Sequence, residues 1–215
     1  MKIKLCLQRT GLFLATAVLF TGCASANYNK AAGTAAALNQ SATLVTTGSV
    51  QMDRTLAALN DLLANPQPDL RMQFKTFDDS VNDLAAAAQD VAAKTQDMQT
   101  QGDAYFTEWD LELAQIHNED IRTRSESRKA ETMAKFAKMH QQYDDTEAAF
   151  KPFMSDLHDI QKFLANDLTP AGLAAIKDPA AKATSDAEPL KKSLTSLSAE
   201  FDDLGLSLSP NTPAK

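Results

Sequence analysis

Cysteine is almost absent from the sequence. Cys6 and Cys23 are the only two in 215 residues, and both lie at the N-terminal end. The chain after them has no thiol, which excludes a disulfide and a thiolate metal site there. That part of the chain must be stable through packing alone, and its roughly 190 residues are enough for one sizeable core.

Glycine and β-forming patterns are scarce as well. There are seven glycines, Val and Ile are few, and Ala, Leu, Asp, Lys and Gln are plentiful. No segment alternates apolar and polar residues over the length of a strand. Gly-rich phosphate loops and the Gly-x-Ser-x-Gly elbow are also missing. The composition therefore predicts an all-α protein, an elongated antiparallel helical bundle with coiled-coil-like packing.

The charge balance is acidic. The full chain carries a formal charge of −7, and without Lys2, Lys4 and Arg9 the remaining 18 basic residues face 28 acidic ones, which gives −10. Both signs are interspersed along the predicted helices, as on solvated helix faces. Because such a domain binds polyanions poorly, we expect no nucleic-acid partner.

Residues 1–22 have the features of a cleaved signal peptide. Three cations precede an apolar run at residues 12–20, which is shorter than the roughly 20 residues that span a bilayer. The run ends at Phe20-Thr21-Gly22-Cys23, which resembles a lipobox. We predict that Phe20, Thr21 and Gly22 are the recognition residues and that Cys23 is lipidated with acyl chains such as palmitate.

A second interpretation of the same segment is ordinary secretion, with cleavage after Ala24 or Ala26. The lipoprotein interpretation is favoured because the apolar run ends directly at Thr-Gly-Cys. Several acyl chains on one residue give stable anchoring. An Asp directly after the lipidated cysteine would favour retention in the inner membrane. This chain has Ala24 at that position, which favours the outer membrane. We expect a bacterial envelope lipoprotein that faces the periplasm.

The chain after the signal peptide divides into amphipathic segments. We predict one domain over residues 23–204, followed by a flexible tail at 205–215. A first helix covers 27–64, with an interruption possible at Thr46-Thr47-Gly48, and a turn follows at 65–68. A second helix begins with Asp69 as N-cap and either breaks at Gly102 or continues through it.

The C-terminal half shows further helical patterns. We predict a third helix over 103–150, a fourth beginning near Pro152, a short helix from Pro170 to Ile176 and a last helix over 190–204. Residues 178–189 read as a linker.

Residues 118–129 are almost wholly polar and interrupt an apolar seam. Either a polar layer lies inside the bundle, or the helix leaves the bundle there as an exposed tip. We favour the tip, and we name Asn118, Arg122, Arg124 and Ser125 as candidate contacts to a protein partner.

Catalytic and metal-binding patterns are weak. Glu108 and Glu112 flank Trp109, but an ion pair to a neighbouring helix is favoured over catalysis, and Trp109 is predicted to anchor the core.

The three histidines, His117, His140 and His158, lack the Glu-x-x-His pattern of a di-metal bundle. His140 with Asp144 is an i,i+4 pair, yet ordinary seam histidines are favoured. We expect no catalytic residue, no metal and no cofactor.

The middle of the chain resembles a known family. Its signature is matched by Glu108-Trp109-x-x-Glu112-Leu113, Asn118, Ile121-Arg122, Ser125 and Thr132, followed by Glu147, Pro152, Phe163-Leu164 and Leu168. The family comprises bacterial helical envelope proteins and is catalogued as a domain of unknown function, number twenty-nine fifty-nine. The resemblance covers about residues 70–176. This chain has Ala165-Asn166-Asp167 where the family commonly has Lys-His-Asn.

That resemblance implies a helical, coiled-coil-like envelope protein and brings no reaction or ligand with it. We therefore expect a non-enzymatic structural or protein-interaction module, tethered to the membrane and contacting an unknown envelope protein. The alternative is a periplasmic carrier that holds a lipid or other apolar ligand between its helices. A homo-oligomer is left open.

Overall fold

The computed structural model describes the backbone of residues 24–209 and the side chains of residues 27–209. The predicted signal peptide and Cys23 lie outside these residues, as do residues 210–215. Helices account for nearly all of the described chain: α1 (Ala24–Ala64), α2 (Arg71–Leu113), α3 (Glu119–Asn166), α4 (Pro170–Ala175) and α5 (Lys177–Leu208). The all-α prediction is confirmed.

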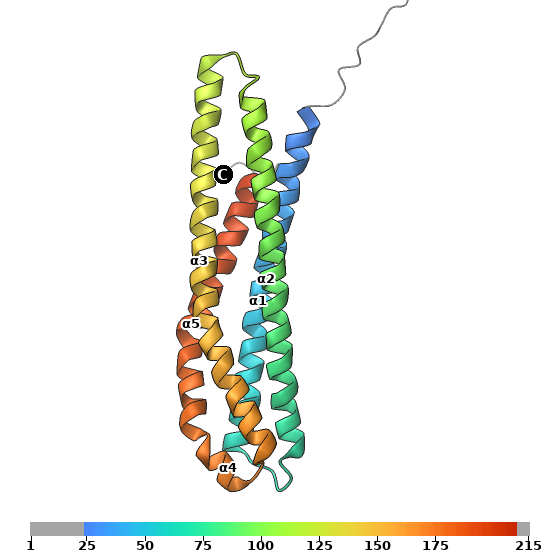
Figure 1. The fold of residues 1–215 in the computed structure, drawn as a ribbon, viewed down its shortest axis with the longest axis vertical. Coiled ribbons are helices and arrows are strands. Elements are labelled where there is room, and N and C mark those ends of the chain that lie inside the picture. The colour runs from blue at the N-terminus through green and yellow to red at the C-terminus, as the bar shows by residue number, and fades with distance from the viewer. Residues whose placement is uncertain (1–23, 210–215) are drawn as a thin grey trace, which may run out of the picture.

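The four long helices run alternately up and down and form an elongated bundle (Figure 1). α1 packs most extensively against α2 and α5, whereas α2 and α3 pack least among the four pairs of long helices that contact each other. We call the end at which α1 begins the N-terminal end. The turn between α2 and α3 lies at this same end, and α4 lies at the opposite end (Figure 1).

The core consists of two apolar clusters, one in each half of the bundle. The cluster toward α4 includes Phe77, Leu84, Phe153 and Leu157, and the cluster toward the N-terminal end includes Leu38, Met98, Phe136, Met139 and Phe201. Leu194 of α5 packs against both clusters. The a/d-like apolar spacing in the sequence places these residues on inward faces, which explains the long antiparallel packing.

The predicted third helix over 103–150 is wrong as one element. The chain reverses at residues 114–118, so that its first part belongs to α2 and the rest to α3. Gly102 lies inside α2, which settles the alternative left open at that residue. The polar residues 119–129 form the first turns of α3, at a point where the α2–α3 hairpin extends beyond the end of α5 (Figure 1). The exposed-tip interpretation holds, but the tip is a hairpin.

The prolines interrupt the helices less than predicted. α3 continues through Pro152 to Asn166, so there is no separate fourth helix. The predicted linker at 178–189 is wrong, because α5 begins at Lys177 and contains that segment. Pro179 lies in the first turn, where its missing N–H costs no helical hydrogen bond. Ala180, Ala183 and Ala187 are buried against the core, and this packing stabilises the segment as a helix.

Other predicted boundaries shift by a few residues. α1 passes through Thr46-Thr47-Gly48 without a break, and both threonine hydroxyls donate to carbonyls four residues earlier. α4 matches the predicted short helix, with Thr169 as its N-cap. α5 ends at Leu208, four residues beyond the predicted end. None of the helices in the described chain is long and apolar enough to cross a membrane.

Candidate functional site

The turn between α2 and α3 is stabilised by a cap on α3. The side-chain oxygen of Asn118 accepts a hydrogen bond of 3.1 Å from the backbone N–H of Ile121. Glu119 and Asp120 occupy the first turn of α3, where carboxylates interact favourably with the helix dipole. The reversal is therefore encoded locally by the sequence Asn-Glu-Asp.

An aromatic group holds the two arms of the hairpin together. The indole N–H of Trp109 donates a hydrogen bond of 2.9 Å to the hydroxyl of Ser125, across from α2 to α3. Tyr105 packs beside Trp109 with ring centroids 5.3 Å apart, and burial raises the pKa of the Tyr105 hydroxyl. The half-buried Trp109 packs against the cluster at the N-terminal end, as the seam predicted.

Glu108 and Glu112, the two glutamates near Trp109, contact α1, whereas Trp109 itself contacts α3. Glu108 forms an ion pair of 2.7 Å with Lys30. Glu112 accepts a longer hydrogen bond of 3.5 Å from the Asn27 side chain, and its other oxygen is buried without a partner among the described residues. The predicted ion pair to a neighbouring helix is confirmed for Glu108. These contacts join the start of α1 to the end of α2.

The four candidate contact residues fall into two groups. Asn118 caps α3, and Ser125 accepts from Trp109, so both have structural roles. Arg122 is half-buried and pairs along α3 with Glu119 at 3.1 Å and Glu126 at 3.8 Å, whereas Arg124 is exposed. Of the four, the two arginines present their charge at the surface of the hairpin.

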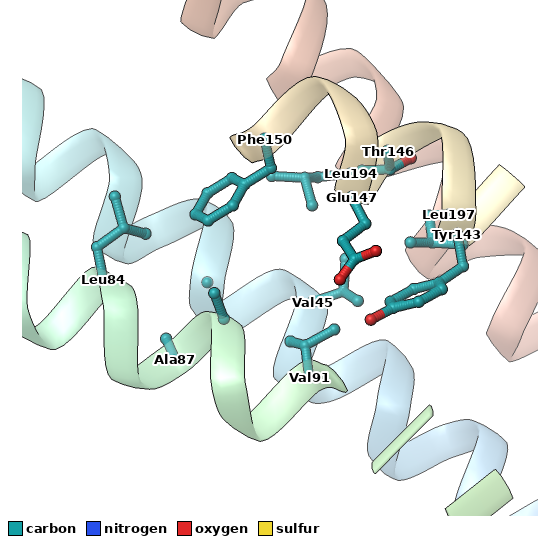
Figure 2. A pocket seen from close by; sticks show the side chains of 12 residues that line it. Val45, Leu84, Ala87, Val91, Tyr143, Thr146, Glu147, Phe150, Leu194 and Leu197 are labelled. Carbon is teal, nitrogen blue, oxygen red and sulfur yellow. The ribbon is translucent and has the colours of Figure 1, made fainter. Parts of the chain in front are cut away.

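An apolar cavity lies near the middle of the bundle, where α2 and α3 separate. All four long helices line it, and its volume is about 60 Å³. Its walls include Val45 of α1, Leu84 and Val91 of α2, Phe150 of α3 and Leu194 of α5 (Figure 2). The sequence did not reveal this cavity, because its lining comes from segments far apart in the chain.

Two polar side chains of α3 extend into this cavity. The carboxylate of Glu147 and the hydroxyl of Tyr143 point toward α2 (Figure 2). Glu147 is ion-paired with Lys151 at 3.0 Å. Burial raises the pKa of Tyr143, and the nearby Glu147 and Asp144 act in the same direction. The tyrosine therefore stays protonated at neutral pH and can act as a hydrogen-bond donor.

The histidines have ordinary surroundings. His140 lies 3.3 Å from Asp144 through Nδ1 and 3.0 Å from the side-chain oxygen of Gln99 through Nε2. His117 is exposed at the turn, and His158 is half-buried on α3. No group of three or more His, Cys, Asp or Glu side chains converges on a metal position within the described residues.

The predicted recognition residues Phe20, Thr21 and Gly22 and the predicted lipidation site Cys23 fall outside the described residues. The described backbone is helical from its first residue, Ala24, which directly follows Cys23 in the chain.

Comparison with protein families gives a match over most of the chain. A family model described as "Protein of unknown function (DUF2959)" matches residues 29–204. The chain belongs to this family. The match extends well beyond the residues 70–176 on which the resemblance was drawn, and includes most of α1 and α5. No curated protein and no solved structure matches the chain.

The central part of the DUF2959 resemblance, residues 108–132, gathers at the hairpin, and the contacts described for it are structural. Asn118 caps α3, Trp109 bonds Ser125, Glu108 pairs with α1, and the buried Thr132 donates to the carbonyl of Arg128. Together they fix the turn and its position beside α1.

The departure at 165–167 also has a structural role. Asn166 donates to the carbonyl of Lys162, and Asp167 accepts a hydrogen bond of 2.7 Å from Thr169. These residues end α3 and lead into α4.

Proposed function

We propose that this chain is a bacterial envelope lipoprotein in which an acylated Cys23 anchors a stiff helical rod. The rod serves as a non-enzymatic structural or protein-interaction module. The observation that carries the proposal is the position of Cys23 directly before α1. With no linker between them, the lipid and the bundle would behave as one body at the membrane surface.

The dimensions of the bundle suit a spacer. α1 contains 41 residues without a break. At 1.5 Å per residue it is about 60 Å long. Anchored at one end, such a rod would carry the opposite end, with α4, well away from the membrane.

The side chains that were considered as catalytic candidates instead make contacts between the helices of the rod. Glu108 is paired with Lys30, and Trp109 with Ser125, so each joins one helix to the next. These contacts support a structural or interaction role, as does the concentration of the central signature residues, 108–132, at the hairpin.

The anchor is tested by intact-mass analysis of the mature protein extracted from membranes, beside a Cys23→Ala variant. We expect the wild-type chain to begin at Cys23 and to carry the mass of two or three acyl chains. The variant should carry no acyl mass, whether it stays an uncleaved precursor or is released into the periplasm. An unacylated wild-type chain that begins at Ser25 or Asn27 would overturn the proposal.

A protein partner is tested by charge reversal on the hairpin. Arg122→Glu with Arg124→Glu should lower the yield of a partner recovered by crosslinking in intact cells, because the surface charge it faces is inverted. The matched control is Arg71→Glu with Lys75→Glu, which changes the net charge equally on exposed residues toward the opposite end. Equal recovery from both variants would remove the hairpin arginines from the interface.

The cavity between α2 and α3 is the feature that favours the alternative, a carrier of apolar ligands. Its walls are apolar, but about 60 Å³ is well below the roughly 300 Å³ at which ligand pockets begin. A carrier would therefore need α2 and α3 to move apart. Native mass spectrometry of the same preparation separates the two functions, since a carrier would retain a ligand and an interaction module would not.

A further inference from the structure

The start of α1 and the turn between α2 and α3 lie at the same end of the bundle (Figure 1). Two contacts fix this arrangement, because Lys30 pairs with Glu108 and Asn27 bonds Glu112. α1 and α2 are antiparallel, so moving from Asn27 back to Ala24 on α1 corresponds to moving from Glu112 forward on α2. Ala24 therefore lies level with the first residues of the turn. The turn reaches slightly farther than the start of α1 (Figure 1).

We infer that residues 111–121, here called the hairpin tip, rest on the lipid surface beside the acylated Cys23, whereas Arg122 and Arg124 follow the tip on α3 and stay available to a protein partner. The inference rests on the proposed function, since Cys23 places the membrane at this end. No linker separates Cys23 from α1. A rod that stands on its anchor therefore presses the hairpin tip against the headgroups. The hairpin tip therefore binds lipid.

The apolar side chains of the hairpin tip suit this position. Leu111 is 57% exposed and Ile121 is 56% exposed, while Ile116 is half-buried in the turn itself. Tyr28, in the second turn of α1, is also 57% exposed at this end. Single exposed aliphatic residues are common on soluble proteins. Here several occur at the end where the chain enters its predicted lipid anchor, and apolar side chains of that kind enter the headgroup region favourably.

The backbone limits how deeply the tip can enter. Residues 114–118 are not helical. The N–H groups of residues 114–116 donate to carbonyls of α2, but no backbone hydrogen bond within the described chain satisfies the N–H groups of residues 117 and 118 or the carbonyls of residues 114–117. Such groups require water or another hydrogen-bond partner and do not enter the hydrocarbon region. The tip therefore lies at headgroup depth, with only the ends of Leu111, Ile116 and Ile121 reaching the acyl chains.

The charge of the tip indicates apolar contact and not electrostatic attraction. Residues 111–121 contain three acidic side chains, Glu112, Glu119 and Asp120, and no lysine or arginine, so anionic lipid would not attract them. Arg122 is already paired with Glu119. Contact with lipid should therefore persist on zwitterionic vesicles and at high salt, where attraction to anionic lipid is screened.

The sequence allows a clean labelling experiment, because its two cysteines are Cys6 in the leader and Cys23. A cysteine placed at Ile116 is then the free thiol of the mature lipoprotein, and Gln67→Cys, in the loop at the opposite end, is the matched control. Each purified lipoprotein is labelled with a polarity-sensitive dye and reconstituted into phosphatidylcholine vesicles. We expect the dye at position 116 to shift to shorter wavelength and become shielded from an aqueous quencher, while the dye at position 67 stays in water.

A second variant separates contact with lipid from the effect of the dye. Leu111→Ser with Ile121→Ser, in the chain labelled at position 116, should reduce the wavelength shift, because the flanking aliphatic groups no longer enter the headgroups. Circular dichroism of the same sample checks that the bundle stays folded. An undiminished shift in the folded variant would show that the tip side chains do not make the contact.

The outcomes distinguish the tip from the anchor. Intact mass and co-flotation of each sample report whether Cys23 is acylated and membrane-bound. A bound protein whose dyes at 116 and 67 are equally exposed to water would overturn the tip contact and leave the anchor standing. Absence of acylation would overturn both. Shielding at 116 that appears in native membranes, but not in pure lipid vesicles, would assign the tip to a protein instead.

Discussion

Replacing Phe201 by alanine should lower the free energy of unfolding by about 3–5 kcal/mol, the usual cost of removing a large buried aromatic side chain. Phe201 of α5 is fully buried in the cluster toward the N-terminal end. A loss of this size is a large fraction of the stability of a typical domain, about 5–15 kcal/mol. Urea denaturation followed by circular dichroism measures it.

Met133→Ala is the control for Phe201→Ala. Met133 lies on α3 with 45% of its surface exposed, and its replacement should change stability by about 0.5 kcal/mol or less. Hydrogen exchange then locates the damage. Protection should fall most in the first half of α1 and the second half of α2, which share a cluster with Phe201, and least near α4. Equal loss along the whole rod would show that the two clusters unfold as one unit.

The number of helices was harder to predict than their presence. The apolar seam through Phe106, Trp109 and Leu113 correctly indicated an inward face, because Phe106 and Leu113 are buried and Trp109 packs against the cluster. The reversal at 114–118 was missed because it contains neither glycine nor proline, and Ile116 prolongs the apolar spacing. A local signal was present, since Asn118 followed by Glu119 and Asp120 is typical of a helix start.

The opposite error occurred at the prolines. Pro152 and Pro189 suggested helix boundaries, yet both lie inside helices. Around Pro189, buried Ala187 and Leu190 pack against the rest of the core. The free energy gained by burying an apolar face along a long helix outweighs the loss of one backbone hydrogen bond. Helix propensity, which is a local property of the sequence, does not include that burial.

The candidate site was also predicted only in part from the sequence. The ion pair of Glu108 to another helix and the anchoring role of Trp109 were accessible from local spacing. Their partners Lys30 and Ser125 were not, because a partner follows only from the correct helix count and register. The same register brings the hairpin tip beside the start of α1. The proximity of the tip to the start of α1 is thus a property of the fold that no local pattern reveals.

Gly102→Ala should destabilise the protein although alanine is the better helix former. A Cβ atom at residue 102 would lie 2.8 Å from Cε1 of Phe136 and closer still to Cζ. Phe136 is itself held by an edge-on contact with Phe106, with ring centroids 5.7 Å apart. Such overpacking costs about 1–3 kcal/mol, of which the helical preference of alanine over glycine offsets about 1 kcal/mol. Urea denaturation measures the net loss.

Gly48→Ala is the matched control, since Gly48 also lies within a long helix but has no atom within 4 Å of the position of a Cβ. Gly48→Ala should raise the free energy of unfolding, because alanine favours the helix more than glycine does. The difference in unfolding free energy between the two variants therefore isolates the overpacking cost, about 1–3 kcal/mol. In a chain that already carries Phe136→Leu, Gly102→Ala should cost less than it does in the wild-type chain, because the shorter side chain leaves room for the methyl group. If Gly102→Ala stabilises the protein as much as Gly48→Ala does, then α2 and α3 are not pressed together at this level. The hairpin would then lack the rigid support that the proposed position of its tip requires.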